Sequence, residues 1–125
     1  MTWKEISLDS LAAAKALLAD EHYRSAVSRA YYAVYSRIVG ALVGKATFPS
    51  GYEGPHHEDL DDLFFDYLSR VSIRDRWRYA SSVKQLYVKR LEADYQPSAT
   101  VDMALARDVV VLASEVFRVI EASYE

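Results

Sequence analysis

The placement of glycine and proline constrains this chain more than any other feature of its sequence. Only four glycines and three prolines occur in 125 residues, and four of these seven lie between Thr47 and His56. A β-rich domain of this size needs turn residues about every 8–12 positions, and long stretches of this chain have none. The sequence therefore predicts an all-α fold.

Apolar residues recur at helical spacing in five segments. We expect helices over residues 8–20 with Ser7 as N-cap, 23–45, 57–69, 73–95, and from a cap at Ser98 or Thr100 to about residue 123. Pro97 ends the fourth helix, because the residue before a proline disfavours the helical conformation. Only the loop 46–56 is long. The short connections favour a single domain over residues 1–125, an up-and-down antiparallel bundle of about five helices.

The second helix carries apolar and aromatic side chains around most of its circumference, so we expect it at the centre of the bundle. The other four helices each present one apolar stripe, which we expect to face the core. These stripes are Leu8, Leu11, Ala14 or Lys15, and Leu18; Leu60, Phe64 and Leu68; Ile73, Trp77, Ala80, Val83 or Lys84, Tyr87 and Leu91; and Val101, Leu105, Val109, Leu112, Val116 and Ile120.

Charge and cysteine content exclude several classes of protein. The chain has 15 basic and 18 acidic residues, and a net charge of -3 argues against non-specific coating of nucleic acid. The absence of cysteine excludes disulfides and thiolate metal sites and suits a reducing compartment. The amino terminus lacks the apolar run of a secretory signal, and no apolar run is long enough to span a membrane. We therefore expect a soluble, cytoplasmic protein.

Three segments go beyond a generic bundle. They are HYRSAVSRAYYAVY at residues 22–35, a histidine before a Leu/Phe-rich helix at residues 57–65, and LYVKRLEADY at residues 86–95. Together they resemble the small prokaryotic HEPN proteins, which carry a segment like SRAYYA followed by a later R-x-x-A-D-Y segment. The resemblance covers nearly the whole chain, with the segments in the same order and at similar spacing.

The resemblance implies a helical bundle that often dimerises and is commonly encoded beside a nucleotidyltransferase-fold protein, in toxin–antitoxin or related defence pairs. Many HEPN proteins are metal-independent ribonucleases, with an arginine followed by a histidine four to six residues later. Arginine stabilises phosphate charge, and histidine exchanges protons near neutral pH. Here the corresponding positions after Arg90 are Asp94, Tyr95 and Gln96, and no histidine is present. An aspartate is ionised at neutral pH and would repel a phosphate.

The candidate site residues lie on the second and fourth helices. Arg90, Asp94 and Tyr95 are the catalytic candidates, and Arg29, Tyr32 and Arg90 are the candidates for binding RNA or a nucleotide. Tyr95 is also where the resemblance places AMP transfer by a nucleotidyltransferase partner. The alternative is structural: Arg90 and Asp94 are four residues apart and can form an ion pair, and Asp94 could also pair with Arg29.

Other polar and aromatic groups allow two interpretations. Tyr23, Tyr31, Tyr32 and Tyr35 could stack on bases, or pack in the core or an interface. The spacing of His57 and Asp61 suits a metal, but an acid-rich helix start explains the same residues, so we predict no metal site and no cofactor. Arg70, Arg74, Arg76, Arg78, Lys84, Lys89 and Arg90 form either a solvated face or a contact surface for RNA or a partner.

Two functional hypotheses follow. The first is a HEPN-family interaction module, dimeric, that acts with a nucleotidyltransferase-type or other defence partner. The second is a metal-independent HEPN ribonuclease whose motif lacks the usual histidine. A nucleotide-binding helper is a third possibility, although the sequence has no glycine-rich phosphate loop.

Overall fold

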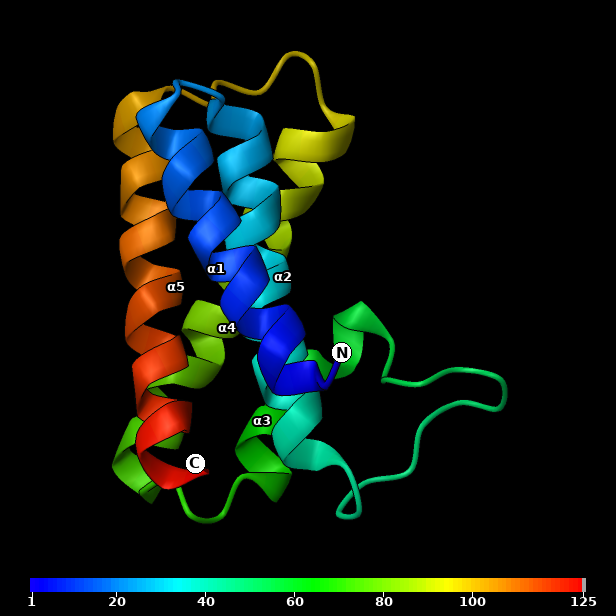
Figure 1. The fold of residues 1–125 in the computed structure, drawn as a ribbon. Helices are drawn as coiled ribbons and strands as arrows, with labels where there is room; N and C mark the ends of the chain where they lie inside the picture. The colour runs from blue at the N-terminus through cyan, green and yellow to red at the C-terminus, as the bar shows by residue number, and fades with distance from the viewer. Residues whose placement is uncertain (125) are drawn as a thin grey trace.

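The computed structural model describes residues 1–124, which fold into an all-α bundle without strands. Its five α-helices are α1 (Trp3–Ala19), α2 (Tyr23–Leu42), α3 (Leu60–Tyr67), α4 (Ile73–Tyr95) and α5 (Met103–Ser123), and the short 3-10 helix η1 (His57–Asp59) precedes α3. Figure 1 shows α1, α2 and α5 side by side, with α4 behind them and the loop between α2 and η1 extending away from the bundle. The predicted fold class is confirmed.

The start of α1 differs from the prediction. Thr2, not Ser7, is the N-cap: its hydroxyl accepts a hydrogen bond from the Glu5 amide at 3.1 Å, and the Glu5 carboxylate accepts one from the Thr2 amide at 2.8 Å. This reciprocal capping box starts the helix at Trp3 rather than at residue 8. Ser7 is buried inside the helix, where its hydroxyl donates to the Lys4 carbonyl.

Among the other helices, the predicted range of α4 is confirmed at both ends. The fifth helix begins later than predicted, because its cap is Asp102, whose carboxylate accepts from the Leu105 amide at 2.9 Å, rather than Ser98 or Thr100. The second helix ends at Leu42 instead of residue 45, just before Gly44 adopts a positive φ of 81°. The predicted third helix is divided into η1 and α3 and ends two residues early, at Tyr67.

Helix α2 lies at the centre of the bundle, as predicted, and packs against α1, α3, α4 and α5. Small residues let α1 approach it closely: Ser7, Ser10 and Ala14 are buried on α1, whereas Leu8 is exposed, contrary to the predicted stripe. Gly40 belongs to the same contact, since a Cβ there would lie 3.1 Å from the Cβ of Trp3. The stripe of α3 is confirmed, with Leu60, Phe64 and Leu68 fully buried.

The buried face of α4 was predicted correctly only in part: Val83 is buried and Ala80 and Tyr87 pack against the core, as expected. The residues that face the core are Tyr79, Val83, Leu86, Arg90 and Ala93. Two residues of the predicted stripe point outward instead: Ile73 is 53% exposed and Trp77 is 70% exposed. An apolar face of α4 is therefore left on the surface.

On α5 the predicted residues Val109, Val116 and Ile120 are buried, and Leu105 and Leu112 are partly buried against the core. Val101, which precedes the helix, is also partly buried there. None of the helices within residues 1–124 combines the length and the apolar composition needed to cross a membrane.

Candidate functional site

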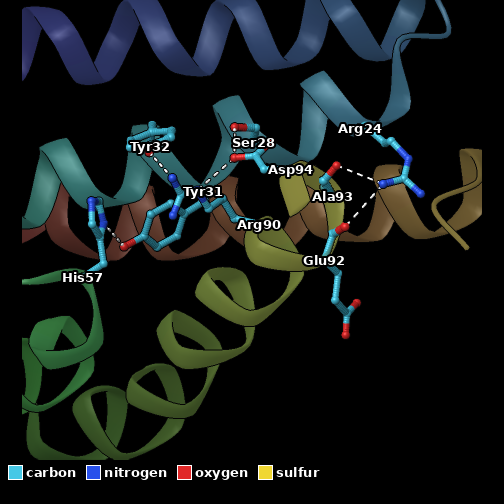
Figure 2. A network of polar contacts seen from close by, with 9 residues as sticks. All are labelled: Arg24, Ser28, Tyr31, Tyr32, His57, Arg90, Glu92, Ala93 and Asp94. Atoms are coloured by element: carbon cyan, nitrogen blue, oxygen red, sulfur yellow. Dashed lines mark hydrogen bonds and ion pairs between the residues drawn. The ribbon is translucent and has the colours of Figure 1, made fainter. Parts of the chain in front are cut away.

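The buried face of α4 carries a charged side chain, Arg90, into the contact with α2. The Nε of Arg90 donates to the Asp94 carboxylate at 3.0 Å, and a terminal nitrogen donates to the Tyr32 hydroxyl. The same Asp94 oxygen accepts from the Ser28 hydroxyl at 3.2 Å (Figure 2). The predicted Arg90–Asp94 ion pair is therefore present within α4, and the hydrogen bonds with Tyr32 and Ser28 join it to α2.

Tyrosine rings surround the Arg90 guanidinium. Its central carbon lies 5.0 Å from the ring centre of Tyr32, 5.5 Å from that of Tyr95 and 6.0 Å from that of Tyr31. At these distances a guanidinium is attracted by the electron-rich ring faces. The cation is thus held by one carboxylate and by aromatic groups, in a position that is only 9% exposed.

Arg29 does not pair with Asp94, contrary to the hypothesis from the sequence. Within residues 1–124 it forms no ion pair, and its guanidinium carbon lies 4.7 Å from the centre of the Tyr32 ring. Arg29 is half-buried, so part of its guanidinium remains exposed to solvent. The buried arginine of α2 is Arg37, which donates to the Tyr124 carbonyl at 3.0 Å.

His57 completes this cluster from a distant part of the chain. Its Nδ1 lies 2.7 Å from the Tyr31 hydroxyl, as Figure 2 shows, and its ring centre is 4.4 Å from that of Tyr35. On the other side it lies parallel to Tyr87 of α4, with 6.1 Å between the ring centres. The sequence around Arg90 could not predict that this histidine lies nearby, because His57 belongs to a distant segment. The only indication in the sequence was its position at the start of the segment 57–65.

The protonation of the cluster follows from burial. Burial raises the pKa of the Tyr31 hydroxyl well above its usual range, with the neighbouring Tyr35 adding to the effect. Burial, followed by the charges of Arg90 and His56, lowers the pKa of His57. Tyr31 therefore keeps its proton, and its contact with His57 joins a neutral hydroxyl to a neutral imidazole, in which the tautomer of His57 decides which group donates.

Tyr95 forms the outer edge of the site, and Val88 is an exposed apolar residue two turns earlier on α4. Tyr95 is 67% exposed and Val88 is 42% exposed, although the Tyr95 ring lies against Arg90. Of the four tyrosines considered as a stacking platform, Tyr31 is fully buried, and Tyr23, Tyr32 and Tyr35 pack partly against the core. These contacts support packing as the role of Tyr31.

Arg24, which sequence reasoning did not single out, holds the end of α4 that carries the site. Figure 2 shows its guanidinium beside the last turn of α4. It donates to five carbonyl oxygens, at 2.7–3.3 Å, in and after that turn: Glu92, Ala93, Gln96, Pro97 and Ala99. The Glu92 and Gln96 carbonyls also accept from backbone amides, whereas the Ala93 carbonyl has no amide four residues on, because residue 97 is a proline. Arg24 therefore caps the helix and joins it to α2.

The basic residues of α4 have different surroundings. Arg76 donates to the carbonyls of Phe65 and Val71 and so fastens α3 to α4, while Arg74, Arg78 and Lys84 are exposed. No three histidine, aspartate or glutamate side chains in residues 1–124 gather as metal ligands would.

Comparison with known proteins identifies one family. The HEPN domain matches residues 1–123, the full length of the helical bundle. No curated protein and no solved structure matches the chain. The match agrees with the three segments at residues 22–35, 57–65 and 86–95, two of which contribute Tyr32, Arg90 and Asp94 to one polar network. The chain belongs to the HEPN domain family.

Proposed function

We propose that this chain is a HEPN interaction module that binds a protein partner through the C-terminal half of α4. The observation that carries the proposal is the exposure of Tyr95 beside an arginine whose charge is already matched, with Val88 exposed two helical turns earlier on α4. Exposed aromatic residues near a polar rim are typical of binding hot spots. The family resemblance suggests a nucleotidyltransferase-fold protein of a toxin–antitoxin or defence pair as the partner.

The state of Arg90 favours binding over catalysis. A phosphate would have to compete with the Asp94 carboxylate for the guanidinium, and that carboxylate would itself repel the phosphate. Arg90 is better placed to hold Tyr32 and Tyr95 in fixed positions. A surface whose side chains are already ordered loses less entropy when a partner binds.

The partner-binding role is tested by co-expressing the chain with a nucleotidyltransferase-fold protein of the kind that the family resemblance implies and measuring co-purification. We expect a stable complex that is lost in Tyr95→Ala and Val88→Asp. Tyr52→Ala is the matched control, because Tyr52 is an equally exposed tyrosine in the loop between α2 and η1. No complex with the wild-type chain, or equal loss in the control, would contradict the proposal.

AMP transfer to Tyr95 is a separate consequence of that partnership. The exposed hydroxyl of Tyr95 could attack the α-phosphate of ATP bound to the partner and release pyrophosphate, with its own proton passing to a base. Intact mass after co-expression should then rise by one adenylyl group in the wild type and not in Tyr95→Phe. An unmodified wild-type mass would remove this idea without affecting the proposed binding.

The second candidate function is a metal-independent ribonuclease, and the observation that favours it is the position of His57. This histidine lies in the same aromatic cluster as Arg90, close enough for the arginine charge to lower its pKa. The 2′-hydroxyl would attack the phosphorus and expel the 5′-oxygen. Neutral His57 would take the proton of that hydroxyl and pass it to the leaving oxygen, while Arg90 stabilises the phosphate charge. This function requires RNA cleavage that falls in both Arg90→Lys and His57→Gln.

A further inference from the structure

The N-terminal half of α4 presents a large aromatic side chain on the surface. Trp77 is 70% exposed, the largest fraction for any aromatic residue within residues 1–124. The indole is positioned by Phe65 of α3, whose ring meets it at 65° with 4.9 Å between the ring centres. An aromatic group that is held by a neighbour but left mostly in water is typical of a binding surface.

A hollow of about 420 Å³ lies beside the indole, between α3 and α4. Phe65 and Trp77 form its aromatic wall, and Asp61 and Asp62 line it from α3. The space is large enough for one long side chain of another molecule. The hollow therefore places an exposed ring and two carboxylates around the same space.

Carboxylates dominate this side of the bundle. Five of them lie within residues 58–66: Glu58, Asp59, Asp61, Asp62 and Asp66. None of the five is in an ion pair within residues 1–124, where the ion pairs lie in the C-terminal half of α4. The start of α3 favours acidic residues, but it does not account for the exposed indole beside them. These charges are free to meet a cation from outside.

A second hollow, of about 450 Å³, adjoins the first, because Asp62 lines both. Asp59 and Asp62 supply its negative charge, and Phe48 and Pro55 supply apolar walls. Both hollows lie at the lower end of the bundle in Figure 1, whereas α4 ends at the top. This surface is therefore separate from the one at Tyr95.

We propose that the two hollows bind a segment of a partner protein that carries two arginines. A guanidinium is planar, so it stacks on an aromatic face and donates paired hydrogen bonds to carboxylates. The first hollow offers both contacts, through the Trp77 indole and the carboxylates of Asp61 and Asp62. A second arginine enters the adjoining hollow and meets Asp59. A nucleic acid would bring its phosphates against these carboxylates, so the charges disfavour RNA here.

The chain itself holds a guanidinium against an aromatic ring next to the first hollow. The central carbon of the Arg76 guanidinium lies 5.7 Å from the centre of the Phe65 ring, and Arg76 donates to the Phe65 carbonyl at 2.9 Å. This internal contact uses the Phe65 ring. The exposed surface of Trp77 is left for a guanidinium from another molecule.

One cation, Lys84, also lines the first hollow. Its ammonium repels an incoming guanidinium and so lowers the affinity of the surface for an arginine. Removal of this charge should strengthen binding, whereas removal of the carboxylates should weaken it. A variant that had merely lost its fold could not bind more tightly, so Lys84 gives the proposal a test of opposite sign.

The test is fluorescence anisotropy of a labelled peptide with two arginines among glycines and serines, titrated with the full chain at low ionic strength. We expect saturable binding that weakens about threefold to tenfold in Trp77→Gln and about tenfold in Asp61→Asn/Asp62→Asn. Lys84→Gln should bind about twofold to threefold more tightly. A peptide with lysines in place of the arginines should bind more weakly, because an ammonium has no planar fork. Circular dichroism confirms that each variant is folded.

Asp9→Asn/Asp108→Asn is the matched control, because it removes two charges at exposed positions of α1 and α5. It should bind the peptide within about twofold of the wild type, since distant exposed charges are screened. Tyr95→Ala should also bind it normally, which keeps this test independent of the proposed partner-binding role. No saturable binding by the wild type, an equal loss in the control, or unchanged affinity in Lys84→Gln would overturn the proposal. Tighter binding of an acidic peptide would overturn it too and assign the surface to the cations of α4.

Discussion

At the scale of single residues, Arg90 and His57 show how a bundle core can contain polar groups. Arg90 is satisfied by Asp94 and by the Tyr32 hydroxyl, and His57 is satisfied by Tyr31. A buried charge is tolerated when such partners replace water. The network therefore has two consequences that can be measured.

The first consequence concerns pH. The pKa of His57 lies below its unfolded value of about 6.5, because burial and the Arg90 charge disfavour the imidazolium. Above that value both states are neutral and His57 adds no pH dependence. As the pH falls below it, the unfolded chain takes up the proton first, so stability is lost. Thermal unfolding at pH 5 and pH 7.5 should show a smaller loss in His57→Gln than in the wild type, and equal losses would contradict this account.

The second consequence concerns the ion pair. Asp94→Asn keeps the shape of the side chain but leaves Arg90 without its carboxylate. Because Arg90 is buried, we expect the free energy of unfolding in urea to fall by about 1–3 kcal/mol. Asp108→Asn on α5 is the matched control, since Asp108 is exposed and forms no ion pair within residues 1–124. A control that loses as much stability as Asp94→Asn would show that the pair contributes nothing specific.

At the scale of helices, capping residues and prolines in the sequence predicted some helix ends correctly and others wrongly. The range of α4 was predicted because Pro97 marks its end unambiguously. The start of α1 was missed because its capping pair, Thr2 and Glu5, lies before the apolar stripe. On α4, Ile73 and Trp77 were wrongly predicted to face the core, because exposed apolar residues at helical spacing have the same periodicity as a core face. The proximity of His57 to Arg90 was not predicted, since it depends on how α2, η1 and α4 pack.

The helix ends give a direct comparison of prediction and structure. Asp102→Ala should lower the free energy of unfolding by about 1 kcal/mol, because it removes the cap on the Leu105 amide. Thr100→Ala, at a position predicted from sequence as a possible cap, should have an effect within about 0.5 kcal/mol. Urea denaturation of both variants measures the difference, and the reverse order would mean that α5 begins earlier.

The attachment of α4 to α2 depends on the planar fork of Arg24. Lysine keeps the charge but cannot donate to five carbonyls at once, so Arg24→Lys should lose about 2–3 kcal/mol of stability. Arg107→Lys is the control at an exposed position of α5. Hydrogen exchange should also be faster in the last turn of α4 in Arg24→Lys. Unchanged exchange there would contradict the capping role.

At the scale of the whole molecule, α4 carries two exposed aromatic side chains in opposite halves of the helix. Its C-terminal half holds the Arg90 network and presents Tyr95, and its N-terminal half presents Trp77. All-α fold class and family could be predicted from the sequence, because glycine placement and ordered motifs are local features. The outward orientation of these two aromatic residues could not, because it depends on which face of α4 the other helices cover.

The most direct measurement is incubation of the purified chain with mixed single-stranded RNA in EDTA, beside Arg90→Lys and His57→Gln. If the chain is an interaction module, RNA should stay intact with the folded wild type, because the Arg90 guanidinium is already paired with the Asp94 carboxylate. Cleavage by the wild type that falls in both variants would contradict that role. It would identify a metal-independent nuclease in which His57 replaces the histidine that the Arg90 segment lacks.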